Sequence, residues 1–278
     1  MTYKMVCIDM DGTLLGKGKK ISENSKEVIK KIHDKGVEIV VTTGRIYNNA
    51  AYYSHLLGVE SPVIAANGAI IRDKLTNKVI YENPIRTDIC VKLIEMLYKM
   101  DFIFHFYTLD GIYCGNKFTK LATKLYMTKQ VGYENLKIKY HVIKNLEEWK
   151  EFFKRTNGQI TKCIAFSIDP KKINILKQQL KDMKDIVYFG AGSRSLEINN
   201  KGVSKGKAVK ILGEYYGFKR EEIVCIGDNE NDISMIEYAG LGVAMGNAIE
   251  QVKDLADFIT DTNKEDGVAK AIKKIFNL

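Results

Sequence analysis

Apolar and polar positions follow two different patterns along this chain. Over the first 70 residues, short apolar runs typical of buried strands are separated by stretches with apolar residues at helical spacing. The β-branched run "VEIVVTTGR" suits a strand buried on both faces of a parallel sheet. The expected elements are a strand at 3–9, a helix at 22–35, a strand at 37–45, a helix at 46–57 and a strand at 62–68. This order predicts an α/β fold with a doubly wound, mostly parallel, Rossmann-like sheet.

The middle of the chain has a different pattern, in which hairpins and amphipathic helices are mixed. Hairpins are expected at 69–83 and 102–114, helices near 87–100, 118–129, 146–155 and 170–183, and strands at 162–169 and 186–192. Strand–helix alternation resumes at "VSKGKAVKILGEYYG". We therefore expect a smaller α+β domain, residues 85–190, inserted into a core domain made of residues 1–84 and 191–278.

The composition is ordinary for a globular protein, with 45% hydrophobic and 28% charged residues among 278. No apolar run approaches the roughly 20 residues of a membrane span, and the N-terminus lacks the pattern of a signal peptide. We therefore expect a cytoplasmic protein with no membrane partner. Five cysteines without a C-x-x-C pair, and four scattered histidines, predict reduced core thiols and no zinc site.

The net charge of +9 raises the question of nucleic acid as a partner. Of the 43 basic residues only six are arginine, whereas nucleic-acid sites depend on arginine forks. The lysines are spread over every predicted helix surface, which favours a solvated positive surface and no nucleic-acid partner. Such a surface can still attract anionic substrates.

Four polar clusters each follow an apolar run that is expected to be a strand. They are Asp9 with Asp11, Thr43-Gly44-Arg45, Asn67-Gly68, and Asp228 with Asn231 and Asp232. In an open α/β sheet the functional crevice lies outside the carboxyl ends of the strands, so these clusters are expected to meet there. Strand alternation would send Asp9 and Asp11 to the same side. The alternative for this pair is an Asp-Gly turn that merely ends a strand.

The residue types in these clusters indicate a site for a metal ion and an anion. The carboxylates of Asp9, Asp11, Asp228 and Asp232 suit a hard cation with oxygen ligands, for which Mg²⁺ fits best. Thr43 offers a hydroxyl, and Gly44 offers an amide that can approach an anion closely. Lys205, just inside a predicted helix capped by Ser204, can place an ammonium group on a phosphate.

Four of these segments also carry a resemblance to a known family. In this order, "DMDGTLL", "TTGR", "SKGKAV" and "GDNENDISM" resemble the four motifs of the haloacid dehalogenase-like phosphohydrolases. The insertion falls between the second and third motifs and follows the segment "ANGA". This placement is similar to that in the Cof-type branch of the family, which has an α+β cap. The resemblance covers the whole chain and implies a magnesium-dependent phosphatase.

The resemblance also implies a role for each residue of the site. Asp9 would be the nucleophile and a metal ligand, and Asp11 the general acid/base, with its backbone carbonyl as a further ligand. The metal would also be held by Asp228 and by Asp232, the latter directly or through its neighbours. The phosphoryl oxygens would be bound by Thr43, Lys205 and Asn231.

The substrate is predicted only as a class of small-molecule phosphate esters. Sugar phosphates come first, followed by phosphorylated cofactors such as pyridoxal phosphate or flavin mononucleotide. The aromatic residues Phe104, Phe106, Tyr107 and Tyr113 could stack on a substrate ring, although alternation places at least half of them in a core. A sugar phosphomutase and a non-catalytic phosphate sensor remain as alternatives. We expect a monomer or a weak homodimer.

Overall fold

The computed structural model describes residues 3–131, 138–190 and 192–278. The chain divides into two compact units, a core unit of Met1–Tyr81 with Ser204–Leu278 and an inserted unit of Glu82–Val203. The second junction therefore falls at 203 and not at the expected 190. The reason is that strand β11 (Ser195–Asn200) pairs with strands of the inserted unit.

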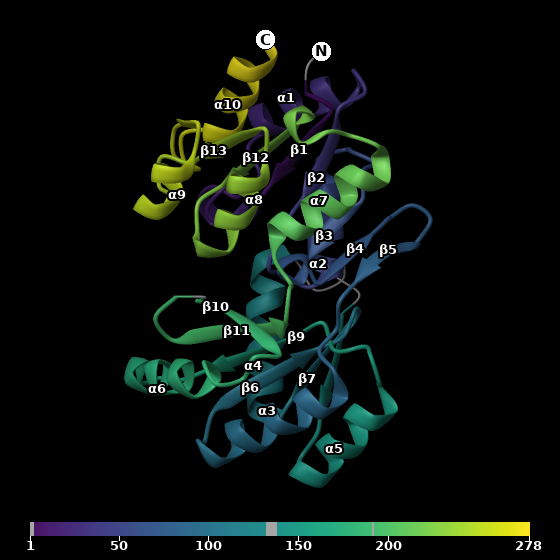
Figure 1. The fold of residues 1–278 in the computed structure, drawn as a ribbon, viewed down its shortest axis with the longest axis vertical. Coiled ribbons are helices and arrows are strands. Elements are labelled where there is room, and N and C mark those ends of the chain that lie inside the picture. The colour runs from purple at the N-terminus through teal and green to yellow at the C-terminus, as the bar shows by residue number, and fades with distance from the viewer. Residues whose placement is uncertain (1–2, 132–137, 191) are drawn as a thin grey trace. The chain divides into compact units, whose positions relative to one another are not determined.

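The core unit is built on a five-stranded sheet whose neighbouring strands are all parallel (Figure 1). Its strand order is β14-β13-β12-β1-β2. These strands are β1 (Met5–Ile8), β2 (Glu38–Val41), β12 (Ile223–Gly227), β13 (Leu241–Ala244) and β14 (Phe258–Ile259). Every residue of β1 and β12 is buried, as expected for strands covered on both faces. The predicted doubly wound α/β fold is confirmed.

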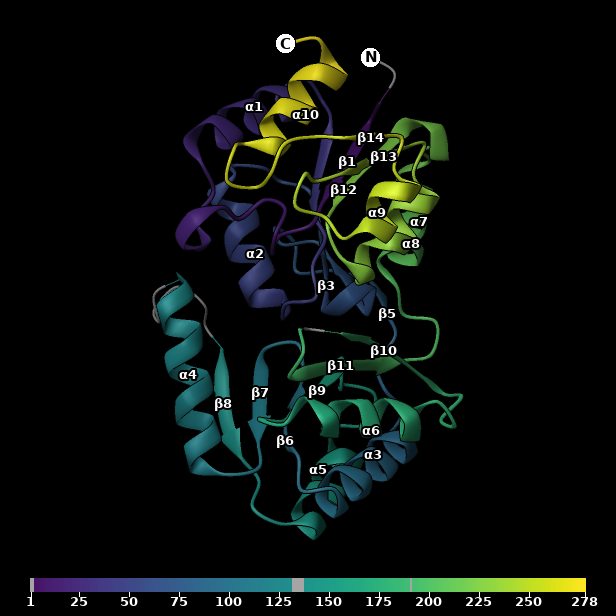
Figure 2. The same cartoon turned by 90° about the vertical axis from the view of Figure 1, so that its left-hand side faces the viewer.

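Helices cover both faces of this sheet (Figure 2). They are α1 (Glu23–His33), α2 (Tyr47–Leu56), α7 (Lys205–Tyr216), α8 (Ile233–Tyr238), α9 (Glu250–Leu255) and α10 (Gly267–Phe276). Helix α1 packs against α10, and α7 packs against α8. Val28, Ile29 and Ile32 form the buried face of α1, and Ser22 caps this helix by accepting a hydrogen bond from the N–H of Ser25. Within the described ranges, no helix is both long and apolar enough to cross a membrane.

The strand order places a topological switch point beside β1. The chain leaves β1 for β2 on one side of it and returns on the other side with β12. The crevice between two such strands opens at their carboxyl ends, where open α/β sheets bind their ligands. Asp9 follows β1 and Asp228 follows β12, so the fold brings these two residues to the switch point.

The third predicted strand lies beside the end of β2, but it pairs mainly with two further strands. β3 (Val63–Ala65) forms a three-stranded sheet with β4 (Ile70–Arg72) and β5 (Val79–Glu82), and joins the main sheet through a bridge between Thr42 and Ile64. The backbone turns directly after β3, because Asn67 and Gly68 take positive φ angles of 62° and 95°. The turn sends β4 back antiparallel to β3.

The inserted unit holds a six-stranded sheet of order β10-β11-β9-β6-β7-β8, antiparallel except for the pair β7–β8. Besides β11, its strands are β6 (Ile103–Tyr107), β7 (Gly111–Cys114), β8 (Lys139–Val142), β9 (Lys162–Phe166) and β10 (Ile186–Gly190). Its helices are α3 (Thr87–Lys99), α4 (Lys117–Val131), α5 (Leu146–Arg155) and α6 (Pro170–Leu180). The apolar pattern did not predict β8 or β11.

The hydrophobic core of the inserted unit lies between one face of this sheet and helices α3, α5 and α6. Phe106 is central to it, with ring centroids 5.2 Å from Trp149 and 4.8 Å from Phe153. Phe104 belongs to the same core, and Tyr113 packs against it. Three of the four aromatic residues considered for stacking on a substrate therefore have a structural role.

We expect Phe106→Ala to destabilise the inserted unit by about 3–5 kcal/mol, because it leaves a cavity in a closely packed core. The only tryptophan of the chain, Trp149, lies in this core, so its fluorescence in a urea titration measures the change. Phe118→Ala is the matched control, since the side chain of Phe118 is 79% exposed and its loss should cost under about 0.5 kcal/mol. Equal midpoints for the two variants would contradict the packing described.

Candidate active site

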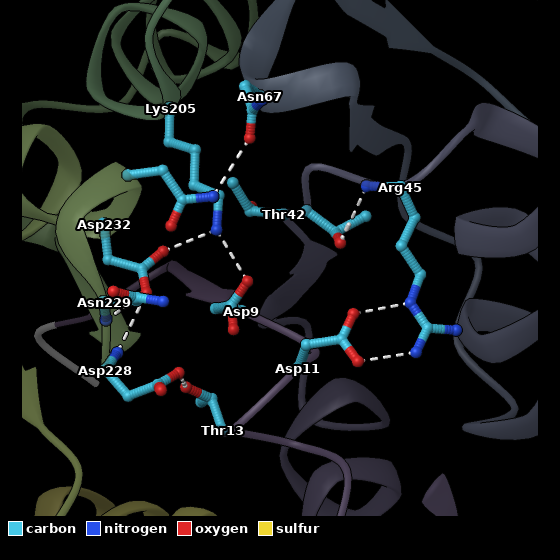
Figure 3. Close-up of polar contacts among 12 residues, drawn as sticks. Asp9, Asp11, Thr13, Thr42, Arg45, Asn67, Lys205, Asp228, Asn229 and Asp232 are labelled. Carbon is cyan, nitrogen blue, oxygen red and sulfur yellow. Dashed lines mark hydrogen bonds and ion pairs between the residues drawn. The ribbon is translucent and has the colours of Figure 1, made fainter. Parts of the chain in front are cut away.

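Three carboxylates come together at the carboxyl ends of the core strands (Figure 3). Asp9 follows β1, Asp228 follows β12, and Asp232 ends the short helical turn Glu230–Asp232 before α8. One oxygen from each lies within 4.8 Å of the others. Carboxylates this close repel one another strongly, so their arrangement needs positive charge nearby.

Lys205 supplies part of that charge. Its Nζ lies 2.6 Å from Oδ1 of Asp9 and 2.5 Å from Oδ1 of Asp232, and its side chain is 0% exposed. Lys205 is the first residue of α7, where Ser204 caps the helix by accepting a hydrogen bond from the N–H of Lys207. Gly206 lets this turn approach α8 closely, because a Cβ there would lie 2.0 Å from the carbonyl oxygen of Ser234.

Backbone N–H groups and one side-chain hydroxyl hold the two carboxylates that come from the β12 loop. Oδ2 of Asp232 accepts hydrogen bonds from the N–H groups of Asp228 and Asn229, at 2.9 and 3.0 Å. The hydroxyl of Thr13 donates to Oδ1 of Asp228 at 2.8 Å. The loop after Asp11 passes so close to Asp228 that a Cβ on Gly12 would lie 2.2 Å from Oδ2 of Asp228. Gly12 also takes a positive φ angle of 92°. Glycine is therefore required there.

The charge of the cluster is not balanced by Lys205 alone, since three carboxylates and one ammonium group leave two negative charges. Burial, and then the charge of Asp232, raise the pKa of Asp9 well above its usual value despite Lys205. The same two causes raise the pKa of Asp228 to about 6. Burial disfavours the charged form of Lys205, but the carboxylates of Asp232 and Asp9 outweigh it and raise its pKa. A clustered oxygen donor set with this residual charge fits a divalent metal ion.

Asp11 has different partners from Asp9. Arg45 forms a forked pair with it, from Nε to Oδ2 at 2.5 Å and from Nη2 to Oδ1 at 2.6 Å (Figure 3). Lys19 donates to Oδ1 at 2.7 Å. Burial alone would raise the pKa of Asp11, but the hydrogen bonds and charges of Arg45 and then Lys19 outweigh it and lower the pKa to about 2. Strand alternation does not apply to Asp9 and Asp11, because β1 ends at Ile8, before both residues.

Besides Lys205 on α7, the residues expected to bind phosphate lie on two loops, which are joined by hydrogen bonds through Asn67. Thr43 is buried directly after β2, and its hydroxyl accepts a hydrogen bond from the N–H of Arg45 at 3.2 Å. Its carbonyl accepts from the N–H of Asn67 at 3.0 Å. Oδ1 of Asn67 in turn accepts from Nδ2 of Asn231, also at 3.0 Å. Gly44 follows Thr43 in the first of these loops.

Sequence reasoning assigned no role to several residues that organise this site. Arg45 and Asn67 were noted in polar clusters, but their pairing with Asp11 and Asn231 depends on contacts far apart in the sequence. The isolated arginine in "TTGR", in a chain rich in lysine, was the available signal for Arg45. Thr13 lies in the segment "DMDGTLL", but no role was assigned to its hydroxyl, and Lys19 lies in a stretch of glycines and lysines without any distinguishing pattern.

Removing Arg45 should raise the pKa of Asp11 by at least about one unit. Burial then favours the neutral carboxyl group, and only Lys19 is left to favour the carboxylate. In the wild type this pKa lies below the ordinary 3.8, so the ion pair stabilises the fold above about pH 4 and its contribution is lost as the pH falls toward 2. Carboxyl ¹³C NMR titration of Arg45→Met checks this, with Asp11→Asn to assign the resonance. Arg72→Met is the control, because Arg72 lies over the ring of Tyr47. An Asp11 that still titrates near 2 without Arg45 would contradict the assignment.

Comparison with known proteins agrees with this geometry. The family model of the haloacid dehalogenase-like hydrolases matches residues 6–272. The 5-amino-6-(5-phospho-D-ribitylamino)uracil phosphatase YcsE of Bacillus subtilis is 33% identical over 97% of this chain and 94% of its own length. A haloacid dehalogenase-like hydrolase from Bacteroides thetaiotaomicron superposes with a TM-score of 0.83 at 30% identity, over 99% of this chain and 100% of that one. The subclass IIB sugar phosphatase BT4131 superposes with a TM-score of 0.78 at 26% identity, over the same shares. The chain therefore belongs to the haloacid dehalogenase-like hydrolase family.

Proposed function

We propose that the protein is a magnesium-dependent phosphomonoesterase that acts through an aspartyl-phosphate on Asp9. Its substrates are sugar phosphates or related small phosphorylated metabolites. The observation that carries the proposal is the buried contact of Lys205 with Asp9 and Asp232 at the carboxyl end of the central strands. A carboxylate nucleophile that attacks a phosphate ester needs fixed positive charge beside it, because nucleophile and substrate are both anionic.

In the first step, a carboxylate oxygen of Asp9 attacks phosphorus, and the bond from phosphorus to the ester oxygen breaks. Dividing the displacement in this way lowers the barrier of a very slow reaction. Lys205, Thr43, Gly44 and Asn231 bind the phosphoryl oxygens and hold them for in-line attack. In the second step, water attacks the phosphorus, which releases inorganic phosphate and restores the carboxylate of Asp9.

Asp9, Asp228, Asp232 and the backbone carbonyl of Asp11 would hold the Mg²⁺. When bound, Mg²⁺ supplies electrostatic stabilisation of the phosphoryl charge and offsets the repulsion between the carboxylates. Asp11 gives a proton to the leaving alkoxide and later takes one from the attacking water. Its carboxylate must separate from Arg45 for this purpose, since the ion pair favours the form without a proton.

The substrate class is supported by the names of the relatives. BT4131 is named a sugar phosphatase, and YcsE is named a phosphatase of a ribityl phosphate. Both names describe a phosphate carried by a polyhydroxylated carbon chain. We therefore place esters of sugars and sugar alcohols first among the substrates of this protein, ahead of phosphorylated cofactors.

The function is tested by phosphate release from a panel of sugar phosphates, sugar-alcohol phosphates and p-nitrophenyl phosphate. We expect turnover with Mg²⁺ and its loss on chelation with EDTA. Asp9→Asn should lower kcat by about 10³-fold or more, since an amide oxygen cannot replace the nucleophile. Circular dichroism confirms that the variant is folded. Turnover by folded Asp9→Asn at more than a few per cent of wild type would refute the role of Asp9.

Lys205→Met should lower kcat/KM by at least about a hundredfold, because the charge beside the nucleophile is lost. Lys207→Met is the matched control, two positions along the same helix. Lys207 is exposed and lies over the ring of Tyr81, 6.0 Å from its centroid. We expect its kcat/KM to change by less than about threefold. Similar losses in both variants, measured on the same ester, would place the catalytic lysine elsewhere.

A further inference from the structure

The loop after β1 (the β1 loop, residues 9–16) carries Asp11, whose backbone carbonyl belongs to the proposed set of metal ligands. The carbonyls on either side of it are engaged in hydrogen bonds. That of Met10 accepts from a backbone N–H of the same loop at 2.9 Å. That of Gly12 accepts from Nδ2 of Asn247 at 2.8 Å. Among the described residues, no backbone N–H donates to the carbonyl of Asp11, so this oxygen is open to another partner.

Two asparagine side chains hold the β1 loop from neighbouring parts of the core unit. Asn247 lies in the turn after β13 and donates to the carbonyl of Gly12. Its Oδ1 accepts a hydrogen bond from the N–H of Asn263, which follows β14, at 2.9 Å. Nδ2 of Asn263 donates to the carbonyl of Leu15 at 2.7 Å. The loop is therefore fixed at two points by amides that are themselves joined.

The turn that carries Asn247 is also bonded to the β12 loop, which carries Asp228. The N–H of Met245 donates to the carbonyl of Gly227 at 3.0 Å, where β12 ends. The N–H of Ile249 donates to the carbonyl of Asp228, also at 3.0 Å. The turn is thus joined to the β12 loop by its backbone and to the β1 loop by one side chain. Both loops carry proposed ligands of the metal ion, so this turn connects two parts of the ligand set.

The ligand from Asp11 depends on the backbone more than the other ligands do. A carboxylate can turn about its side-chain bonds to meet a metal ion, whereas a backbone carbonyl lies where its loop places it. Mg²⁺ demands nearly ideal octahedral geometry with short bonds to oxygen. Groups that orient metal ligands without touching the metal typically change its affinity by about 10–100-fold when they are removed. The position of the β1 loop relative to the β12 loop should therefore affect metal affinity.

We propose that Asn247 is a positioning residue of the metal site, which fixes the spacing between the loops of Asp11 and Asp228, and that Asn263 supports it. The inference rests on the proposed function, because it concerns the metal ion of that reaction. An amide suits this task, since it donates to one loop and accepts from another without adding charge beside the cation. A lysine in the same place would donate equally well but would repel the metal ion.

The test measures the Kd of Mn²⁺ by electron paramagnetic resonance, with no phosphate ester present. Mn²⁺ is the probe because carboxylate and carbonyl oxygens suit it as they suit Mg²⁺. Asn247→Ala should raise this Kd by about tenfold or more. Asn263→Ala should raise it by about threefold, since its contact with the loop lies farther along the chain from Asp11. At saturating Mg²⁺, kcat of Asn247→Ala on p-nitrophenyl phosphate should return to within about threefold of wild type, because every ligand is still present.

The matched control is Asn24→Ala, which removes an asparagine that also joins two elements of the core unit. Nδ2 of Asn24 donates to Asp266 at 3.0 Å, and its Oδ1 accepts from Lys273 at 2.9 Å. Circular dichroism in urea should show a loss of stability in all three variants, since each loses side-chain hydrogen bonds. The Kd of Mn²⁺ should change by less than about twofold in Asn24→Ala, because its contacts lie between α1 and α10.

The outcomes separate this inference from the proposed function. A wild-type Kd in folded Asn247→Ala, or in folded Asn263→Ala if the first variant does not fold, would overturn the role of the asparagines and leave the proposed function standing. A rise in Kd as large in Asn24→Ala would also overturn it, because general loosening of the fold would then be the cause. A wild type that binds no Mn²⁺ and releases no phosphate would instead refute the proposed function, and this inference with it.

Discussion

The candidate active site depends on one buried ammonium group that is shared between two carboxylates. Lys205 contacts both Asp9 and Asp232, and without it three carboxylates would be held together with no fixed positive charge among them. Such a cluster would take up protons instead of remaining ionised, as the raised pKa values of Asp9 and Asp228 already indicate. Lys205 therefore favours the ionised form of Asp9, the proposed nucleophile, and the remaining negative charge favours a divalent cation.

The fold brings these charged groups together through the positions of its strand ends and loops. Parallel strands place their carboxyl ends at one edge, and the switch of direction beside β1 opens a crevice there. Close approach of the loops then depends on residues without side chains, since a Cβ on Gly12 or Gly206 would overlap its neighbours. Backbone N–H groups hold Asp232 in place. The close approach of the charged residues therefore requires the glycines beside them.

Much of this arrangement could be predicted from the sequence, because it follows from local patterns. An apolar run followed by acidic residues identifies the end of a parallel strand, and this reasoning indicated that Asp9 and Asp228 would meet. Lys205 was assigned to the site from its place at the start of a predicted helix and from the family resemblance. The ion pair between Asp11 and Arg45 could not be predicted, since it depends on where β1 ends and how two loops lie in space. Strand β11 does alternate apolar and polar residues and pairs with both β10 and β9, but it stands so close to the start of the next α/β segment that it was assigned to the core domain. The second boundary of the insertion was therefore placed too early.

Asp9 and Asp11 are two residues apart, yet the structure gives them opposite electrostatic environments. Burial and Asp232 favour the protonated form of Asp9, whereas Arg45 and Lys19 favour the anionic form of Asp11. With a pKa of about 2, Asp11 carries a proton at pH 7 in roughly one molecule in 10⁵. An acid that is so rarely protonated contributes little to the departure of an alkoxide. The proposed role of Asp11 therefore requires a second arrangement, in which its carboxyl group has left Arg45 and lies beside the ester oxygen. The forked contact seen here is then a resting position, and the strength of the Arg45 pair is part of the barrier to reaching the active one.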